Sequence, residues 1–176
     1  MCFLKNISRI GRIYYLNDLP KRKPNRLNSY DYSQSGLYFI TICVKDKRHL
    51  LGKIDQPNNA VILSRYGKIV KNKIMITESY FSCASFVQFV IMPNHIHFII
   101  NLKNEEYQDN TSQERFNMKI PLIVSMLKRL INKEVGFNIW QRSYHDHIIR
   151  NEREYKLISD YIQNNPANWN KDCFYN

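Results

Sequence analysis

The 176-residue sequence lacks any hydrophobic run that approaches the ~20 residues needed to span a membrane. Its N-terminus also lacks the continuous apolar core and the small-residue cleavage site of a secretory signal peptide. The length suffices for one domain with a sizeable core. We therefore expect a single-domain cytoplasmic protein with no membrane partner.

Closely spaced cysteines are also absent. The four cysteines, Cys2, Cys43, Cys83 and Cys173, are widely scattered, and no pair has the C-x-x-C spacing of a metal motif. This pattern is typical of a reducing compartment, so we expect no disulfides.

Acidic side chains are scarce relative to basic ones, with 15 Asp and Glu against 26 Lys and Arg, a formal net charge of +11. An excess of this size in a small domain suggests a polyanionic partner. The 12 Tyr, 9 Phe and 2 Trp residues supply rings that could stack on unpaired bases, while basic groups contact phosphates. A basic protein with an aromatic core would have the same composition, so composition leaves both interpretations open.

Part of the basic excess lies in residues 1–35, which carry seven basic against two acidic side chains. Pro20 and Pro24 interrupt this segment, and it has little apolar periodicity. We expect an irregular arm that is either solvated or in contact with phosphates. Within it, Arg22, Lys23 and Arg26 are candidate DNA-binding residues.

The rest of the chain alternates between strand-like and helix-like patterns. We expect strands over 37–44, 86–92, 95–102 and 140–149, helices over 60–80, 120–135 and 152–165, and a loop over 103–117. This order predicts an α+β fold, a ferredoxin-like βαββαβ antiparallel sheet with an additional C-terminal helix. We expect the helices on one face of the sheet, with another α+β sandwich as the alternative. The predicted domain covers residues 36–169, and 170–176 form a short tail.

Two histidines stand inside one of these strands, in Met92-Pro93-Asn94-His95-Ile96-His97-Phe98-Ile99-Ile100. Residues two apart in a strand face the same side, so His95 and His97 would project together as half of a metal site. Histidines on an apolar face also occur as core residues, and the chain has a second pair in His145-Asp146-His147. Spacing alone leaves the metal site and core packing open.

The last predicted helix carries Tyr161 and Asn165, which are four residues apart and therefore share a helical face. A tyrosine hydroxyl can act as a nucleophile if it is activated, and an asparagine oxygen can bind a metal. Packing of the helix onto the sheet would explain the same tyrosine.

Four segments together resemble one known family. They are Asp31-Tyr32-Ser33-Gln34-Ser35-Gly36-Leu37-Tyr38-Phe39-Ile40-Thr41-Ile42-Cys43, the strand with His95 and His97, Trp140-Gln141-Arg142-Ser143-Tyr144-His145-Asp146-His147-Ile148-Ile149-Arg150-Asn151-Glu152, and Asp160-Tyr161-Ile162 with Asn165-Pro166. Their identity and order resemble the REP-associated tyrosine transposases, members of the single-tyrosine HUH nuclease superfamily. The resemblance covers residues 30–169, and the ferredoxin-like sheet is also the fold of that family.

The resemblance implies a metal-dependent tyrosine transposase, a single-strand DNA endonuclease. In it, His95 and His97 bind Mg²⁺ or Mn²⁺, and Asn165 supplies a further ligand. Tyr161 attacks a DNA phosphorus, forms a 5′-phosphotyrosine and leaves a free 3′-OH, and we expect the cation and the surrounding basic charge to favour its phenolate. We expect His147 to be structural or to support a metal-binding histidine.

The implied partner is single-stranded or hairpin DNA. Such DNA requires phosphate contacts along a stem and stacking for unpaired bases, and Lys128, Arg129 and Lys133 are candidates for the stem. Two alternatives remain: a domesticated hairpin-DNA-binding protein without strand-transfer activity, and a metal-dependent phosphoesterase that uses water. The protein would act as a monomer or a homodimer.

Overall fold

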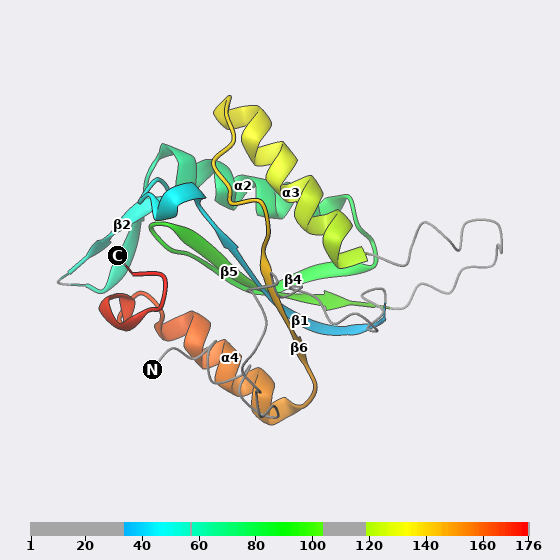
Figure 1. Cartoon of the computed structure of the whole chain (residues 1–176). Coiled ribbons are helices and arrows are strands. Elements are labelled where there is room, and N and C mark those ends of the chain that lie inside the picture. Colours follow the sequence, from blue (N-terminus) through cyan, green and yellow to red (C-terminus); the bar gives the residue numbers. More distant parts are fainter. Residues whose placement is uncertain (1–33, 57, 104–118, 176) are drawn as a thin grey trace, which may run out of the picture.

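A computed structural model describes residues 34–56, 58–103 and 119–175 (Figure 1). The strands are β1 (Gly36–Cys43), β2 (Gly52–Asp55), β3 (Ala60–Leu63), β4 (Ala84–Ile91), β5 (His95–Leu102) and β6 (His145–Ile149). The helices are α2 (Arg65–Ser79), α3 (Lys119–Val135) and α4 (Glu152–Asn164), with short 3₁₀ turns η1 (Lys45–Lys47) and η3 (Trp169–Lys171). None of these helices is long and apolar enough to cross a membrane. Most of the basic arm and of the loop expected over 103–117 lies outside the described residues.

The main sheet has four strands in the order β4-β5-β1-β6, and each neighbouring pair is antiparallel. With α2 and α3 as connections, these strands form the ferredoxin-like βαββαβ core, and α4 follows as the additional helix. The predicted fold class is therefore confirmed. The central strands β1 and β5 pair along their full length, so that Thr41 lies opposite His97 and Cys43 opposite His95.

The predicted helix over 60–80 is wrong at its start. Residues 60–63 form β3, which pairs with β2 in a separate two-stranded sheet. The helix begins only after Ser64, whose Oγ accepts hydrogen bonds from the backbone N–H groups of Tyr66 and Gly67 at 3.1 and 3.2 Å. Ile62 has helical spacing with the residues that follow, yet it lies in β3 with 49% of its surface exposed.

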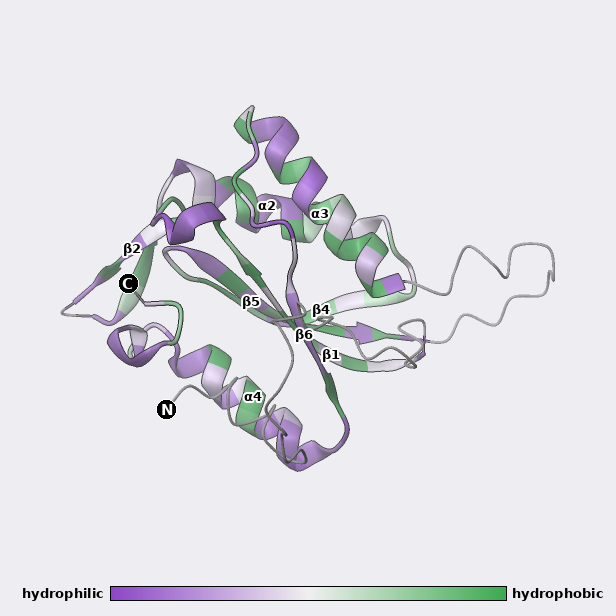
Figure 2. Ribbon diagram, viewed as in Figure 1, coloured by the Kyte–Doolittle hydropathy of each residue, from purple (hydrophilic) through white to green (hydrophobic). Residues whose placement is uncertain are grey.

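Helices cover both faces of the main sheet, not one face as expected. In Figure 1, α2 and α3 lie on one side of the sheet and α4 on the other. The reason is that β1 and β5 are apolar on both faces: Tyr38 and Ile40 belong to the larger core cluster, whereas Phe39 and Ile99 belong to a second one. Ile158 and Ile162 of α4 are buried in this second cluster. In Figure 2, hydrophobic and hydrophilic residues alternate along the helices, as expected for helices that bury one side against the sheet.

Two further expectations need correction. The strand predicted over 140–149 forms only at His145–Ile149, and Trp140 instead makes an isolated bridge with Val44. Cys43 and Cys83 are buried and form no disulfide, but Cys173 is disulfide-bonded, which contradicts the expectation that the chain has no disulfides. Spacing along a sequence does not reveal which cysteines meet in space.

Candidate active site

His95 and His97 project from β5 toward α4, on the same face of the sheet. Both side chains are fully buried, and their ring centroids are 4.4 Å apart. Their intervening neighbour Ile96 points into the larger core cluster on the opposite face. The alternation of the strand thus brings the two imidazoles together, as the spacing predicts.

The hydrogen bonds of His95 fix which of its nitrogens carries a proton. Nδ2 of Asn94 donates to the carbonyls of Phe174 (2.8 Å) and Lys47 (3.3 Å), so Oδ1 of Asn94 faces Nδ1 of His95 at 2.8 Å as an acceptor. Nδ1 therefore carries the hydrogen, and Nε2 keeps its lone pair. Nε2 is buried and has no hydrogen-bond partner among the described residues. Burial lowers the pKa of His95 to about 3, so the ring stays neutral at physiological pH.

Each ring nitrogen of His97 contacts one polar side chain. Nδ1 lies 2.7 Å from Oγ1 of the buried Thr41, and Nε2 lies 3.3 Å from the hydroxyl of Tyr161. Burial and the neighbouring His95 hold the pKa of His97 well below its ordinary value. Both histidines are thus neutral, which is the form that binds a metal.

Tyr161 reaches the histidines from α4. This helix begins after Asn151, whose Oδ1 accepts a hydrogen bond from the backbone of Glu154 at 2.9 Å. The Tyr161 ring packs edge-on against Phe39, and its hydroxyl donates to Oδ2 of Asp172 at 2.9 Å. Burial, followed by the charge of Asp172, raises the pKa of Tyr161. The groups of the protein itself thus favour the phenol, so the phenolate expected at this position would depend on the bound cation.

Asp172 was missed by the sequence interpretation, which placed it in the short tail. Its carboxylate offers a ligand atom close to those of His95 and His97, and the three atoms lie within 4.8 Å of one another. Ligands of one ion with bonds of 2.0–2.2 Å stand at most about 4.4 Å apart, so small movements would allow a shared cation. Nothing in the sequence around Asp172 marks it as part of a motif.

Asn165 lies one helical turn after Tyr161 and is also buried. Its Nδ2 donates to Oδ2 of Asp172 at 2.7 Å, and its Oδ1 is buried without a hydrogen-bond partner among the described residues. An oxygen in this state is costly to keep unless it binds something. Asn165 and Asp172 are therefore both candidate oxygen ligands beside the two histidines.

The C-terminal segment packs against the histidine rings. The centroid of Phe174 lies 4.7 Å from that of His95 and 5.8 Å from that of His97. The ring centroid of Trp169, in η3, lies 5.8 Å from that of His95 and 5.6 Å from that of His49. These aromatic contacts contribute to the complete burial of both histidines.

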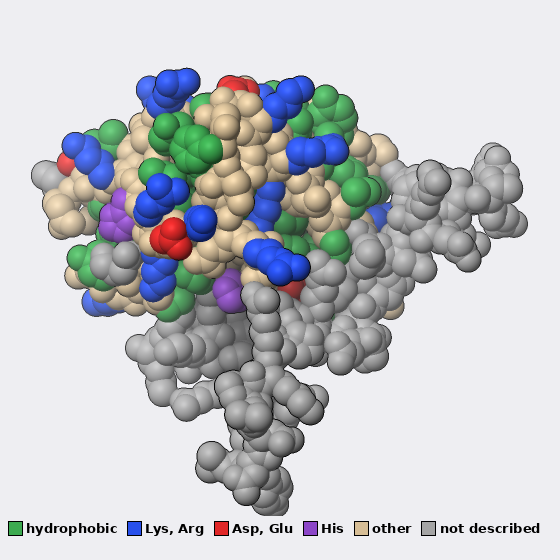
Figure 3. All heavy atoms as spheres, turned by 45° about the horizontal axis from the view of Figure 1, so that its top comes forward, with side chains coloured by type: hydrophobic (Ala, Val, Ile, Leu, Met, Phe, Trp, Pro, Cys, Tyr) green, Lys and Arg blue, Asp and Glu red, His purple; other side chains and the backbone are tan. Residues whose placement is uncertain are grey.

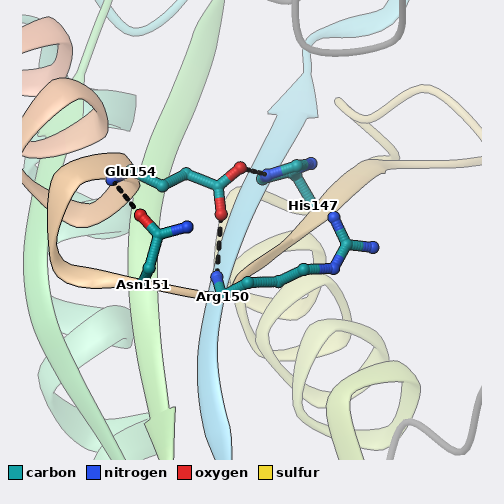
Figure 4. A network of polar contacts seen from close by, with 4 residues as sticks. All are labelled: His147, Arg150, Asn151 and Glu154. Carbon is teal, nitrogen blue, oxygen red and sulfur yellow. Dashed lines mark hydrogen bonds and ion pairs between the residues drawn. The ribbon is translucent and has the colours of Figure 1, made fainter. Parts of the chain in front are cut away.

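His147 does not join the histidine pair. Its Nε2 contacts Oε1 of Glu154 at 2.6 Å, and Oε2 of Glu154 accepts a hydrogen bond from the backbone of Arg150 at 2.7 Å (Figure 4). This network connects β6 to the first turn of α4 and so helps to fix the helix that carries Tyr161. The contacts fit a structural role for His147.

The predicted DNA-binding residues on α3 lie on the other face of the sheet from the histidines. Nζ of Lys128 donates to the carbonyls of Gln141 and Ser143, each at 2.9 Å, and burial lowers its pKa to about 8. Arg129 and Lys133 are exposed, and Figure 3 shows many Lys and Arg side chains on this face with few acidic ones. Arg22, Lys23 and Arg26 lie outside the described residues.

No family model matches the sequence. An uncharacterised protein of Haemophilus influenzae is 37% identical over 170 residues, which cover 88% of this chain and 93% of that protein. A second Haemophilus influenzae protein, provisionally named a REP-associated tyrosine transposase, is 27% identical over 145 residues, 78% of this chain and 73% of its own length. A solved structure of a REP-associated tyrosine transposase bound to a REP hairpin has a TM-score of 0.59 and 23% identity, covering 82% of this chain and 73% of that one.

The chain belongs to the same family as the uncharacterised Haemophilus protein, and its fold is that of a transposase of known structure. Its sequence and fold are similar to those of the REP-associated tyrosine transposases, which confirms the resemblance inferred from the four segments. This similarity supports a transposase-family role.

Proposed function

We propose that the protein cleaves and rejoins single-stranded or hairpin DNA through a covalent intermediate on Tyr161. The observation that supports this most directly is the position of the Tyr161 hydroxyl, 3.3 Å from Nε2 of His97 and 2.9 Å from Asp172. A tyrosine that served packing alone would not need its hydroxyl among two neutral histidines and a carboxylate.

The side chains around Tyr161 fit a divalent cation. Nε2 of His95 and Oδ1 of Asn165 are buried polar atoms without hydrogen-bond partners among the described residues. We infer that His95 and His97 hold Mg²⁺ or Mn²⁺, with Asn165 as the predicted oxygen ligand. When bound, the cation would neutralise charge that grows on the phosphate oxygens. Oxygen ligands would favour these hard ions, which imidazoles alone do not select.

The chemical step proceeds from the hydroxyl of Tyr161. Its oxygen attacks a DNA phosphorus, the phenol proton is given up, and the bond to the 3′ oxygen breaks. That oxygen takes a proton and leaves as a free 3′-OH, while the 5′ phosphate stays on the tyrosine. Because the phosphodiester energy is retained in the covalent link, a new 3′-OH can reverse the step without a nucleotide cofactor.

Hairpin DNA is the proposed partner because the similar transposase structure contains a REP hairpin. The net charge of +11 supports binding of a polyanion. The exposed Arg129 and Lys133, and Arg22, Lys23 and Arg26 of the arm, remain the proposed phosphate contacts. Lys128 is a weaker candidate, because its ammonium group already holds two backbone carbonyls. The cytoplasmic location and a monomeric or dimeric state are part of the same proposal.

The proposal is tested by incubating the protein with single-stranded hairpins from around its own gene, with Mn²⁺, with Mg²⁺ and with a chelator. We expect nicking at a defined site only when the metal is present. The His95→Ala/His97→Ala double variant should remain folded and should not cleave. Normal cleavage by that variant would show that the histidines are packing residues.

The alternative function is a hairpin-DNA-binding protein without strand transfer. The position of Phe174 over His95 favours this alternative, because a phosphate that approached the histidines would have to displace the ring. The same incubation distinguishes the two functions: tight hairpin binding without any nick would identify a binding protein.

A further inference from the structure

We propose that Asp172 is the positioning residue of the site, because one of its oxygens orients both the hydroxyl of Tyr161 and the amide of Asn165. This inference rests on the proposed function, in which Tyr161 is the nucleophile. It concerns a residue outside the four segments that resemble the transposases.

The contacts converge on the carboxylate from three directions. Oδ2 accepts from the Tyr161 hydroxyl at 2.9 Å and from Nδ2 of Asn165 at 2.7 Å, and Oδ1 accepts from the backbone N–H of Phe174 at 2.7 Å. Two carboxylate oxygens can accept about four hydrogen bonds, so three donors suit the group without crowding. The backbone of the C-terminal segment thus fixes the carboxylate, and the carboxylate fixes Tyr161 of α4 and Asn165, the C-cap of that helix.

For Tyr161, the consequence is a fixed direction of its O–H bond. A phenol hydroxyl rotates about its C–O bond and takes the direction of its best acceptor, which is the charged Oδ2. With the hydrogen directed at Asp172, the lone pairs of the oxygen point away from the carboxylate. Positioning of this kind removes part of the entropic barrier, and small misplacements of a reacting atom reduce rates steeply.

For Asn165, the consequence is which end of the amide faces outward. A carboxylate only accepts hydrogen bonds, so the amide nitrogen must face Asp172 and Oδ1 must face away. That oxygen is buried without a partner among the described residues. Asp172 therefore holds Asn165 in the one orientation in which it presents an oxygen, not an N–H group, to a ligand.

Asp172→Ala removes all three contacts, and Asp172→Asn keeps the shape while one acceptor becomes a donor. Lys171→Ala, at the exposed neighbouring position, is the matched control. In the metal-free protein, ¹H and ¹³C NMR of labelled tyrosine should give a slowly exchanging Tyr161 hydroxyl proton in the wild type and in the control. This resonance should be lost in Asp172→Ala. Its survival there would overturn the proposal.

The second measurement is the rate of covalent adduct formation at saturating hairpin DNA and Mn²⁺. We expect Asp172→Ala to lower this rate about 10- to 100-fold, with Asp172→Asn between it and the wild type. Hairpin affinity should stay within about two-fold of the wild type in both variants. Mn²⁺ affinity, measured by EPR titration, should stay within about two-fold in Asp172→Asn, which keeps an acceptor oxygen for the amide of Asn165.

The outcomes separate the possible roles of Asp172. A ten-fold loss of Mn²⁺ affinity in Asp172→Asn would overturn the proposal and make Asp172 a metal ligand. Faster adduct formation in Asp172→Ala would also overturn it, because Asp172 would then merely block the site. A wild-type protein that forms no adduct contradicts the proposed function instead, and the Tyr161 hydroxyl resonance still decides whether Asp172 orients that side chain.

Discussion

The hydroxyl oxygen of Tyr161 lies 3.3 Å from Nε2 of His97, although 64 positions separate the two residues in the chain. One residue comes from the last helix and the other from a central strand of the sheet. Their contact depends on the placement of α4 against the face of β1 and β5 opposite α2 and α3 (Figure 1). The fold thus brings a hydroxyl and two neutral imidazoles together in a buried site.

The buried histidines should make the protein sensitive to acid. Both rings have lowered pKa values, that of His95 being about 3, whereas a histidine in the unfolded chain titrates near 6.5. Below pH ~6.5 the unfolded state therefore binds more protons, and the stability present above that pH is lost as the pH falls, at up to ~1.4 kcal/mol per pH unit for each histidine. Urea unfolding should give a free energy about 2–4 kcal/mol lower at pH 5.0 than at pH 7.5. The His95→Gln/His97→Gln variant should lose most of this dependence, and an equal dependence in that variant would contradict the account.

Thr41 should support metal binding without being a ligand, because its hydroxyl lies 2.7 Å from Nδ1 of His97. Thr41→Val keeps the shape and removes the hydrogen bond, so Mn²⁺ affinity should fall about 10- to 100-fold, as at other supported histidine ligands. Thr77→Val is the matched control, since Thr77 is also buried but its hydroxyl has no partner among the described residues. Calorimetric titration with Mn²⁺ compares the Thr41→Val and Thr77→Val variants. Equal affinities would show that Thr41 does not support metal binding.

His147 should stabilise α4 without affecting the metal. Its contact with the Glu154 carboxylate, 2.6 Å long and partly buried, is a hydrogen bond to a charged group (Figure 4). His147→Ala should lower the free energy of unfolding by about 1.5–3 kcal/mol and leave Mn²⁺ affinity unchanged. Lys156→Ala, which breaks an exposed pair with Glu152, should cost less than about 0.5 kcal/mol. A loss of Mn²⁺ affinity in His147→Ala would assign it to the metal site.

DNA binding should depend steeply on salt, because phosphate contacts release counterions. If Arg129 and Lys133 each contact one phosphate, their double Ala variant should flatten the plot of log affinity against log salt by about two units for duplex DNA. Removal of residues 1–28, which include Arg22, Lys23 and Arg26, should flatten it further. If the salt slope were unchanged in the Arg129→Ala/Lys133→Ala variant, α3 would not contact the DNA phosphates, and the DNA would bind on the face that carries the histidines and Tyr161.

The sequence was most informative where periodicity decides the structure. Alternation in β5 predicted that His95 and His97 share a face, and the helical spacing of Tyr161 and Asn165 placed them one turn apart. Periodicity could not distinguish β3 from the start of α2, since a cap such as Ser64 only becomes decisive once its backbone contacts are known.

The contacts of Asp172 and Phe174 could not be predicted from the sequence, for a different reason. Both residues follow the last helix, where no repeating pattern exists, and their roles arise from how the chain returns across the sheet. The direction in which the protein's own groups shift the pKa of Tyr161 was also beyond the sequence, because it depends on local burial and on this one carboxylate. The predicted effect of a bound cation stays a prediction.

The central claim is that Tyr161 forms a covalent bond with DNA, and denaturing gels with a 5′- or 3′-labelled hairpin test it most directly. The wild type should give a metal-dependent adduct that retains the DNA on the 5′-phosphate side, and peptide mass spectrometry should locate it on Tyr161. Tyr161→Phe should fold, bind the hairpin nearly as well and form no adduct, whereas Tyr155→Phe, six residues earlier on α4, should remain active. An adduct that persists in Tyr161→Phe would contradict the account.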